Sequence, residues 1–170
     1  MISGTANYHQ TVHEWVDNPD GPRTIAEARI IAENNGAPID DDMHFIRLTD
    51  TDFDAMFGNA YAGYGRFRVR SDNDLIRWKS ASGHSLLDAS GKINIWVRAS
   101  ILDSDRAITA VLAHEAYEIE ALRVAFAKNG GALKSKQYED LIKIDVPGNF
   151  HWNAAEFGDQ LVRDMIQQGK

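Results

Sequence analysis

Two long segments of the chain carry apolar residues at helical spacing. In residues 104–128 these residues lie three and four positions apart, which predicts a helix with one buried stripe. Ser100 or Ser104 is a suitable N-cap for this helix, and Gly130 would end it. Residues 151–168 form the second segment, which is strongly amphipathic. The buried stripe of the first helix consists of Ile108, Val111, Leu112, Ile119, Leu122 and Phe126.

Alternation of apolar and polar residues predicts the strands. Lys92–Arg98 is the best of them, because its isoleucine and valine side chains line one face and its polar residues line the other. Further strands are expected near residues 43–48, 64–70 and 75–78. We therefore expect an α+β fold in which a small, mostly antiparallel sheet packs against the two long helices.

The length and composition fit a single globular domain. The chain has 170 residues, of which 44% are hydrophobic and 25% are charged. A turn cluster, DNPDGP, ends at Pro22, and Thr24 with a glutamate three positions later forms a capping box at the start of a helix. We expect residues 1–23 to form an N-terminal arm and turn, and residues 24–170 to form the core.

The overall charge argues against binding to polyanions. The net charge is -7 and the pI is about 5.3, so nucleic acid and anionic membranes are disfavoured as partners. Arg66, Arg68 and Arg70 nevertheless alternate along one predicted strand and form a basic face. This face is either an exposed surface that balances an acidic protein or a docking face for an anionic substrate.

Cysteine is absent from the chain, which excludes disulfides, thiolate metal sites and a cysteine nucleophile. It also excludes a zinc-dependent base deaminase, which needs paired cysteines. No apolar run is long enough to span a membrane, and the first ten residues lack the basic and apolar regions of a signal peptide. We expect secretion by a dedicated system or delivery as part of a larger protein, and otherwise a cytoplasmic location.

The first long helix contains an unusual set of polar residues. Glu115 falls in the middle of its apolar face, while His114 and Glu118 lie four positions apart on the flank of that face. A carboxylate on a buried stripe is costly unless it is paired or ligated. Glu115 is therefore either one half of a buried salt bridge or a general base or acid beside a metal.

The second long helix could complete this site. His151 opens it and points along the same stripe as a set of small residues, which would allow another helix to approach closely. His114, Glu118 and His151 would then supply two imidazoles and a carboxylate, a ligand set suited to a catalytic Zn²⁺ with an open position. The alternative is a core histidine that hydrogen-bonds to a carbonyl group.

The segment HEAYE, from His114 to Glu118, resembles the H-E-x-x-H signature of zincin metallopeptidases. It departs from that signature in its last residue, and the resemblance covers only about residues 92–128. The resemblance implies that Glu115 activates a metal-bound water. It also implies that the preceding strand borders the substrate, with Asn94 or Arg98 available to position it.

A longer resemblance rests on three segments of the chain. They are INIWVRASILDSDRAI at residues 93–108, AHEAYEIEALR at residues 113–123 and PGNFH at residues 147–151. Across roughly residues 25–167 the chain is similar to a C-terminal domain of large bacterial polymorphic toxins, including Rhs-type effectors. This resemblance implies a role in interbacterial competition and a cognate immunity protein as partner.

Three functions remain open from the sequence. The first is a metal-dependent hydrolase, a zincin-like peptidase or amidase. The second is a toxin of another class, such as a nuclease that uses the arginine face. The third is a non-enzymatic binding module in which Glu115 and His151 belong to a buried polar network.

Overall fold

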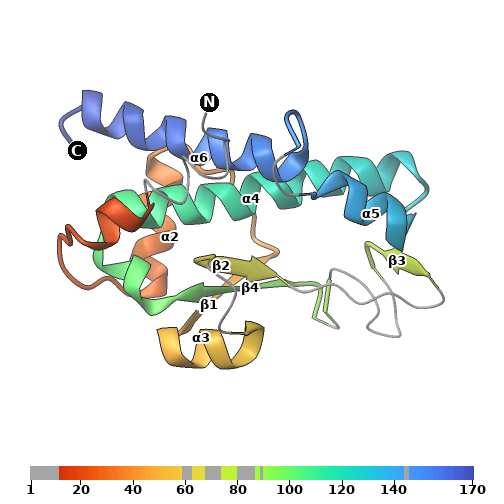
Figure 1. Ribbon diagram of the computed structural model, residues 1–170, viewed down its shortest axis with the longest axis horizontal. Helices are drawn as coiled ribbons and strands as arrows, with labels where there is room; N and C mark the ends of the chain where they lie inside the picture. The colour runs from red at the N-terminus through yellow and green to blue at the C-terminus, as the bar shows by residue number, and fades with distance from the viewer. Residues whose placement is uncertain (1–11, 59–62, 68–73, 80–86, 89, 144–145) are drawn as a thin grey trace.

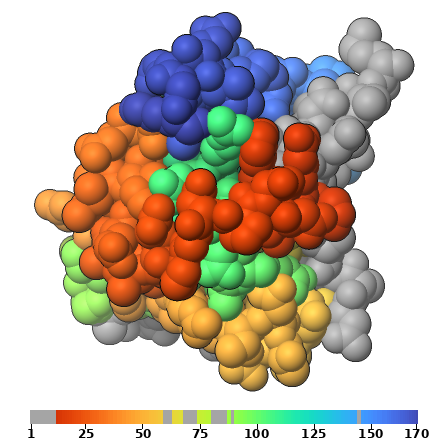
Figure 2. Space-filling model, turned by 90° about the vertical axis from the view of Figure 1, so that its left-hand side faces the viewer, coloured from red at the N-terminus to blue at the C-terminus, as the bar shows by residue number. Residues whose placement is uncertain are grey.

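The fold is a stack of layers around one central helix. The computed structural model describes all residues except 1–11, 59–62, 68–73, 80–86, 89 and 144–145. Helix α4 (Asp105–Lys128) runs through the middle, with α6 (Phe150–Gln167) on one side and the main sheet on the other (Figure 1). Helix α3 (Asp50–Phe57) covers the opposite face of that sheet. In the end-on view, the end of α6 and α3 lie at opposite extremes of the molecule (Figure 2).

Helix α4 is central because it is apolar over most of its circumference. Ser104 caps its first turn by accepting a hydrogen bond from the backbone N–H of Ala107, at 3.3 Å, as the sequence predicts. Alanines fill the positions between the larger apolar residues, so the sheet can pack on one side and α6 on the other. The α+β class is confirmed, but α6 contacts α4 and covers its side away from the sheet.

Among the described residues, the main sheet has three strands in the order β1-β4-β2. Strand β4 (Ile93–Arg98) lies in the centre, and its alternating apolar side chains are buried, as expected from their period of two. Strand β1 (Met43–Leu48) pairs with β4 in parallel, and β2 (Gly65–Phe67) pairs with it antiparallel. The longest pairing is thus parallel, unlike the mostly antiparallel sheet expected, because the chain between β1 and β4 is long enough to cross over.

A second, smaller sheet forms at the far end of α4. Strand β3 (Leu75–Arg77) pairs antiparallel with β5 (Ala132–Lys134), so it lies outside the main sheet. Helix α5 (Ser135–Leu141) follows directly. Together they bury a separate apolar cluster that includes Ile76, Leu122, Phe126, Leu133 and Tyr138.

Side-chain caps begin several of the helices. The capping box of Thr24 and Glu27 opens α2 (Ile25–Asn34), and Asn149 caps α6 through the backbone N–H of Phe150. Helix α3 begins directly after β1. Its cap is Thr49, which accepts a hydrogen bond from the backbone N–H of Asp52 at 3.1 Å. A 3-10 helix, η1 (Ala99–Asp103), joins β4 to α4.

The two long helices approach most closely at Gly158. A Cβ atom added to this residue would lie 2.7 Å from the carbonyl oxygen of Ala110 on α4, closer than side-chain carbons come to backbone. Glycine at this position therefore sets the separation of α4 and α6. That separation in turn determines whether residues on the two helices can meet.

We expect Gly158→Ala to lower the free energy of unfolding by about 1–3 kcal/mol, because α6 must move away from α4. At an exposed helix position, replacing glycine by alanine would instead raise the free energy of unfolding by about 1 kcal/mol. Gln160, which is exposed near the middle of α6, provides that control through the pair Gln160→Gly and Gln160→Ala. Urea denaturation of the wild type and the three variants measures both differences. Two differences of the same sign would contradict the tight contact.

Candidate metal centre

Three ligand-type side chains from α4 and α6 converge, as the helical projection predicts. His114 and Glu118 lie one turn apart on α4, with His114 Nε2 3.3 Å from Glu118 Oε2. His151, in the first turn of α6, places its Nδ1 3.3 Å from the same carboxylate oxygen. One ligand atom from each residue lies within 4.8 Å of the other two, so the group could hold a metal ion.

The three side chains are held in place by their surroundings. His114 and Glu118 are buried, and the side chain of His151 is only 19% exposed. The two imidazole rings meet edge to face, with centroids 4.8 Å apart and an angle of 77° between their planes. Because the rings are not stacked, their nitrogen atoms can point toward a common centre.

Two of the three distances between ligand atoms match tetrahedral coordination, and the third, between the two imidazoles, is within 4.8 Å. Metal–ligand bonds of 2.0–2.1 Å in a tetrahedron separate neighbouring ligand atoms by about 3.3 Å. The two separations at Glu118 Oε2 are both 3.3 Å. Charge-assisted hydrogen bonds between nitrogen and a carboxylate are shorter, at about 2.7–2.9 Å.

The electrostatics keep these groups in the protonation states that a metal requires. Burial lowers the pKa of His114, although the carboxylate of Glu118 acts to raise it. The lowered pKa favours the neutral imidazole. Burial alone would raise the pKa of Glu118, but hydrogen bonds from His114 and His151 outweigh it and bring this pKa to about 2. A neutral imidazole and an ionised carboxylate are the forms that bind metals.

Glu115 lies beside this cluster, one position along α4. Its side chain is buried, and burial followed by the charge of Glu118 raises its pKa, while the charge of Arg66 opposes the shift. No ion pair to Glu115 occurs among the described residues, so the buried salt bridge considered from the sequence is not seen there. A raised pKa is typical of a general acid or base.

The edge strand β2 makes room for Glu115. A Cβ atom added to Gly65 would lie 3.2 Å from Glu115 Oε1 and 3.1 Å from a methyl group of Val111. Both contacts are tighter than ordinary packing, so a side chain at residue 65 would press on the carboxylate. The glycine of β2 therefore allows the strand to close over Glu115.

The structure places the other predicted site residues away from the cluster. Asn94 lies on the sheet face opposite α4, where it donates to Asp88 at 3.2 Å and contacts His44 Nδ1 at 3.1 Å. Arg98 is buried on the same face and donates to the carbonyl of Gly63 and the carboxylate of Asp54, each at 2.7 Å. These contacts tie β4 to neighbouring segments.

The arginine face is only partly described. Arg66 is exposed on β2, and its guanidinium carbon lies 5.2 Å from the ring centroid of Phe57 on α3. Arg66 therefore points to the α3 side of the sheet, although its charge still acts on Glu115. Arg68 and Arg70 lie outside the described residues.

Sequence reasoning missed Tyr138 as a neighbour of the cluster. It is buried on α5, and its pKa is raised first by burial and then by the charges of Glu118 and Glu115. The segment around it has no clear periodicity, and only the docking of α5 against the end of α4 brings it near. A single sequence contains no signal for that contact.

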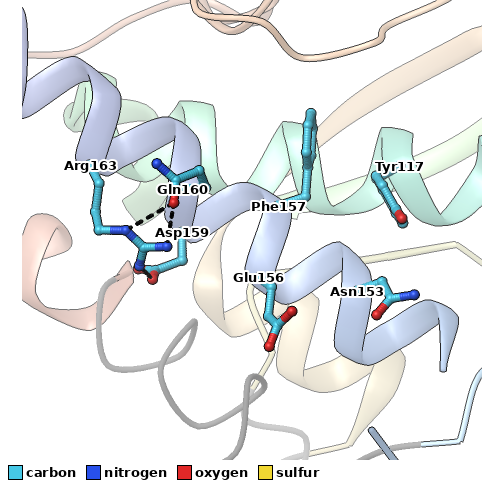
Figure 3. Close-up of a pocket in the computed structure, with 7 residues that line it drawn as sticks. All are labelled: Tyr117, Asn153, Glu156, Phe157, Asp159, Gln160 and Arg163. Carbon is cyan, nitrogen blue, oxygen red and sulfur yellow. Dashed lines mark hydrogen bonds and ion pairs between the residues drawn. The ribbon is translucent and has the colours of Figure 1, made fainter. Parts of the chain in front are cut away.

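A separate groove runs along the outer side of α6 and is shown in Figure 3. Within it, Arg163 donates to Gln160 at 2.7 Å and also pairs with Asp159. Tyr117, from α4, also lines the groove and packs against Phe157, with ring centroids 5.1 Å apart. The residues lining the groove are Tyr117, Asn153, Glu156, Phe157, Asp159, Gln160 and Arg163.

Comparison with protein-family models, with curated proteins and with solved structures finds no match for the chain. Within the described part of the chain, no helix is both long and apolar enough to cross a membrane. Any function must therefore be argued from the metal-ligand cluster and its surroundings.

Proposed function

We propose that this domain is a metal-dependent hydrolase that cleaves a peptide or other amide bond. The observation that carries the proposal is the convergence of His114, Glu118 and His151 beside a buried Glu115. Two imidazoles and one carboxylate leave one position of a tetrahedral Zn²⁺ open for water. The bound metal would polarise the scissile carbonyl and lower the pKa of that water toward about 7.

In this proposal Glu115 moves the proton. It accepts a proton from the attacking water as the water oxygen bonds to the carbonyl carbon and the carbonyl π electrons move to the oxygen. The tetrahedral species then collapses, the carbon–nitrogen bond breaks, and the proton on Glu115 passes to the departing amine. A carboxyl group whose pKa is raised by burial suits both transfers.

The setting that we propose is that of a bacterial effector. The similarity of residues 93–108, 113–123 and 147–151 to polymorphic-toxin domains supports it. The cluster itself draws on the last two of these segments, since they supply all three ligand-type residues. The substrate would then be an amide bond inside a competing bacterium, and an immunity protein would protect the producing cell.

One alternative is favoured by the same geometry. Without a metal, Glu118 accepts from two imidazoles and joins α4 to α6, which would make the cluster a structural clamp in a binding module. Such a clamp needs neither an open coordination position nor Glu115. Metal content separates the two functions.

We expect the purified protein to contain about one equivalent of Zn²⁺, and His114→Ala and His151→Ala to lose it, because each removes one of three ligands. His44→Ala is the matched control, since His44 is exposed on β1 and contacts Asn94. Elemental analysis after gel filtration measures the metal, and circular dichroism checks the fold. A folded wild-type protein that binds no metal after incubation with Zn²⁺ would favour the clamp.

A further inference from the structure

Asn149 joins the end of α5 to the start of α6. Its Oδ1 accepts a hydrogen bond from the backbone N–H of Phe150 at 2.8 Å, which caps α6. Its Nδ2 donates to the carbonyl oxygens of Asp140 and Lys143, each at 2.9 Å, in and just beyond the last turn of α5. One amide group therefore binds backbone groups at both helix ends, where the helices themselves supply no partner.

The ligand-type residue His151 follows two positions after Asn149, in the first turn of α6. The residue between them, Phe150, packs against the apolar cluster that β3, β5 and α5 form with the end of α4. The backbone that carries the His151 imidazole is therefore held by hydrogen bonds at Asn149 and by packing at Phe150.

The position of His151 decides the geometry of the metal centre. His114 and Glu118 lie one turn apart on α4, so the helix itself fixes their separation. His151 comes from a second helix, and its Nδ1 lies 3.3 Å from Glu118 Oε2. Gly158 holds α6 against α4 two turns further along, about 10 Å from His151. A tilt of α6 by roughly 6° around that contact would move His151 by roughly 1 Å, far more than the ~0.2 Å that metal–ligand bonds tolerate.

We propose that Asn149 is a positioning residue of the metal centre. Its hydrogen bonds to the carbonyl groups of α5 fix the start of α6 and keep His151 at the distance from Glu118 that a shared metal ion requires. This inference rests on the proposed hydrolase, because it concerns the metal ion of that enzyme. It adds to the site a residue that sets the metal affinity without touching the metal.

Asn149→Ser tests this role, because serine caps a helix about as well as asparagine but has no amide group to donate to the two carbonyls. Competition with a chromophoric chelator measures the Zn²⁺ dissociation constant of the folded protein. We expect this constant to rise about 10-fold or more in Asn149→Ser. Asn129→Ser is the matched control and should leave it unchanged, because Asn129 Nδ2 donates to the carbonyl of Ala125, at 2.8 Å, at the far end of α4.

Asn149→Asp provides a second variant for the same measurement. Aspartate keeps both the cap and the shape of the side chain, but it lacks the two N–H donors. Its negative charge would by itself favour the binding of a cation. Weaker Zn²⁺ binding by Asn149→Asp can therefore be attributed to the loss of the donors.

Urea denaturation of the metal-free proteins separates positioning from a merely structural role. Asn149→Ser and Asn129→Ser should each unfold at a lower urea concentration than the wild type, because each loses hydrogen bonds to backbone carbonyls. Only the Asn149 variants should also bind Zn²⁺ more weakly. Unchanged Zn²⁺ dissociation constants in both Asn149 variants overturn the role of Asn149 and leave the hydrolase intact. A wild-type protein that binds no Zn²⁺ overturns the hydrolase, and this inference with it.

Discussion

Glu115→Gln is expected to reduce the hydrolytic activity by about 10²–10⁴-fold while the protein keeps its metal. The amide cannot accept the proton of the attacking water, so the step that Glu115 is proposed to catalyse is lost. Because the substrate is not known, the first measurement is growth of bacteria that express the domain in the cytoplasm. Wild type should arrest growth, and Glu115→Gln should not.

The substitution Glu115→Gln should not disturb the fold. Gln has the shape of Glu, so it fits under Gly65 without new contacts. Burial already disfavours the ionised form of Glu115, and a neutral amide removes that cost. The variant should therefore be as stable as the wild type or more stable, and a loss of toxicity could not be attributed to unfolding.

Glu120→Gln is the matched control for Glu115→Gln. Glu120 lies on the same helix but forms an ion pair with Arg123 at 3.2 Å. It should retain full activity and full metal content. If Glu115→Gln arrests growth as strongly as the wild type at equal expression, Glu115 is not the general base.

The core of the candidate site was predictable because it depends on helix geometry. His114 and Glu118 must share a face when they lie four positions apart on a helix. The small residues Ala154, Ala155 and Gly158 follow the same stripe as His151 and indicated a close approach to another helix. The structure confirms that His114, Glu118 and His151 meet. The two helices approach closely at Gly158, which lies against Ala110.

What the sequence did not predict depends on contacts between distant segments. Strand β3 was expected near residues 75–78, but its partner β5 was not. Each strand is three residues long and they pair across more than fifty residues, so no pattern of alternation indicates the pairing. Asn94 or Arg98 was expected to position the substrate, because the resemblance to zincins implies that their strand borders it. The partners of Arg98 are Gly63 and Asp54, which come from other segments, and no local pattern indicates that they bind it.

Glu118→Gln is expected to abolish metal binding with little effect on the metal-free fold. Glu118 contributes the only carboxylate of the cluster, and its ionised form is the one that the two imidazoles stabilise. Loss of an outer partner of a metal ligand already costs about 10–100-fold in affinity, so loss of the charged ligand itself should cost more. The amide retains the shape of the side chain and can still hydrogen-bond to an imidazole.

Thermal unfolding with and without Zn²⁺ measures this effect. At a metal concentration near 1,000 times the dissociation constant, binding adds about 4 kcal/mol to the stability. For a domain of 170 residues this should raise the Tm of the wild type by roughly 10 °C. The Tm of Glu118→Gln should not change with Zn²⁺ and should lie near that of the metal-free wild type.

The comparison also decides between the two functions that share this geometry. A metal centre predicts that the Tm of wild type and Glu118→Gln differ strongly only when Zn²⁺ is present, because only the wild type gains stability from bound metal. A clamp predicts that Zn²⁺ has no effect on either protein, and that any difference arises from the two contacts at 3.3 Å. Glu118→Leu extends the test, since it removes the acceptor and should destabilise the metal-free protein by about 1–3 kcal/mol in either case.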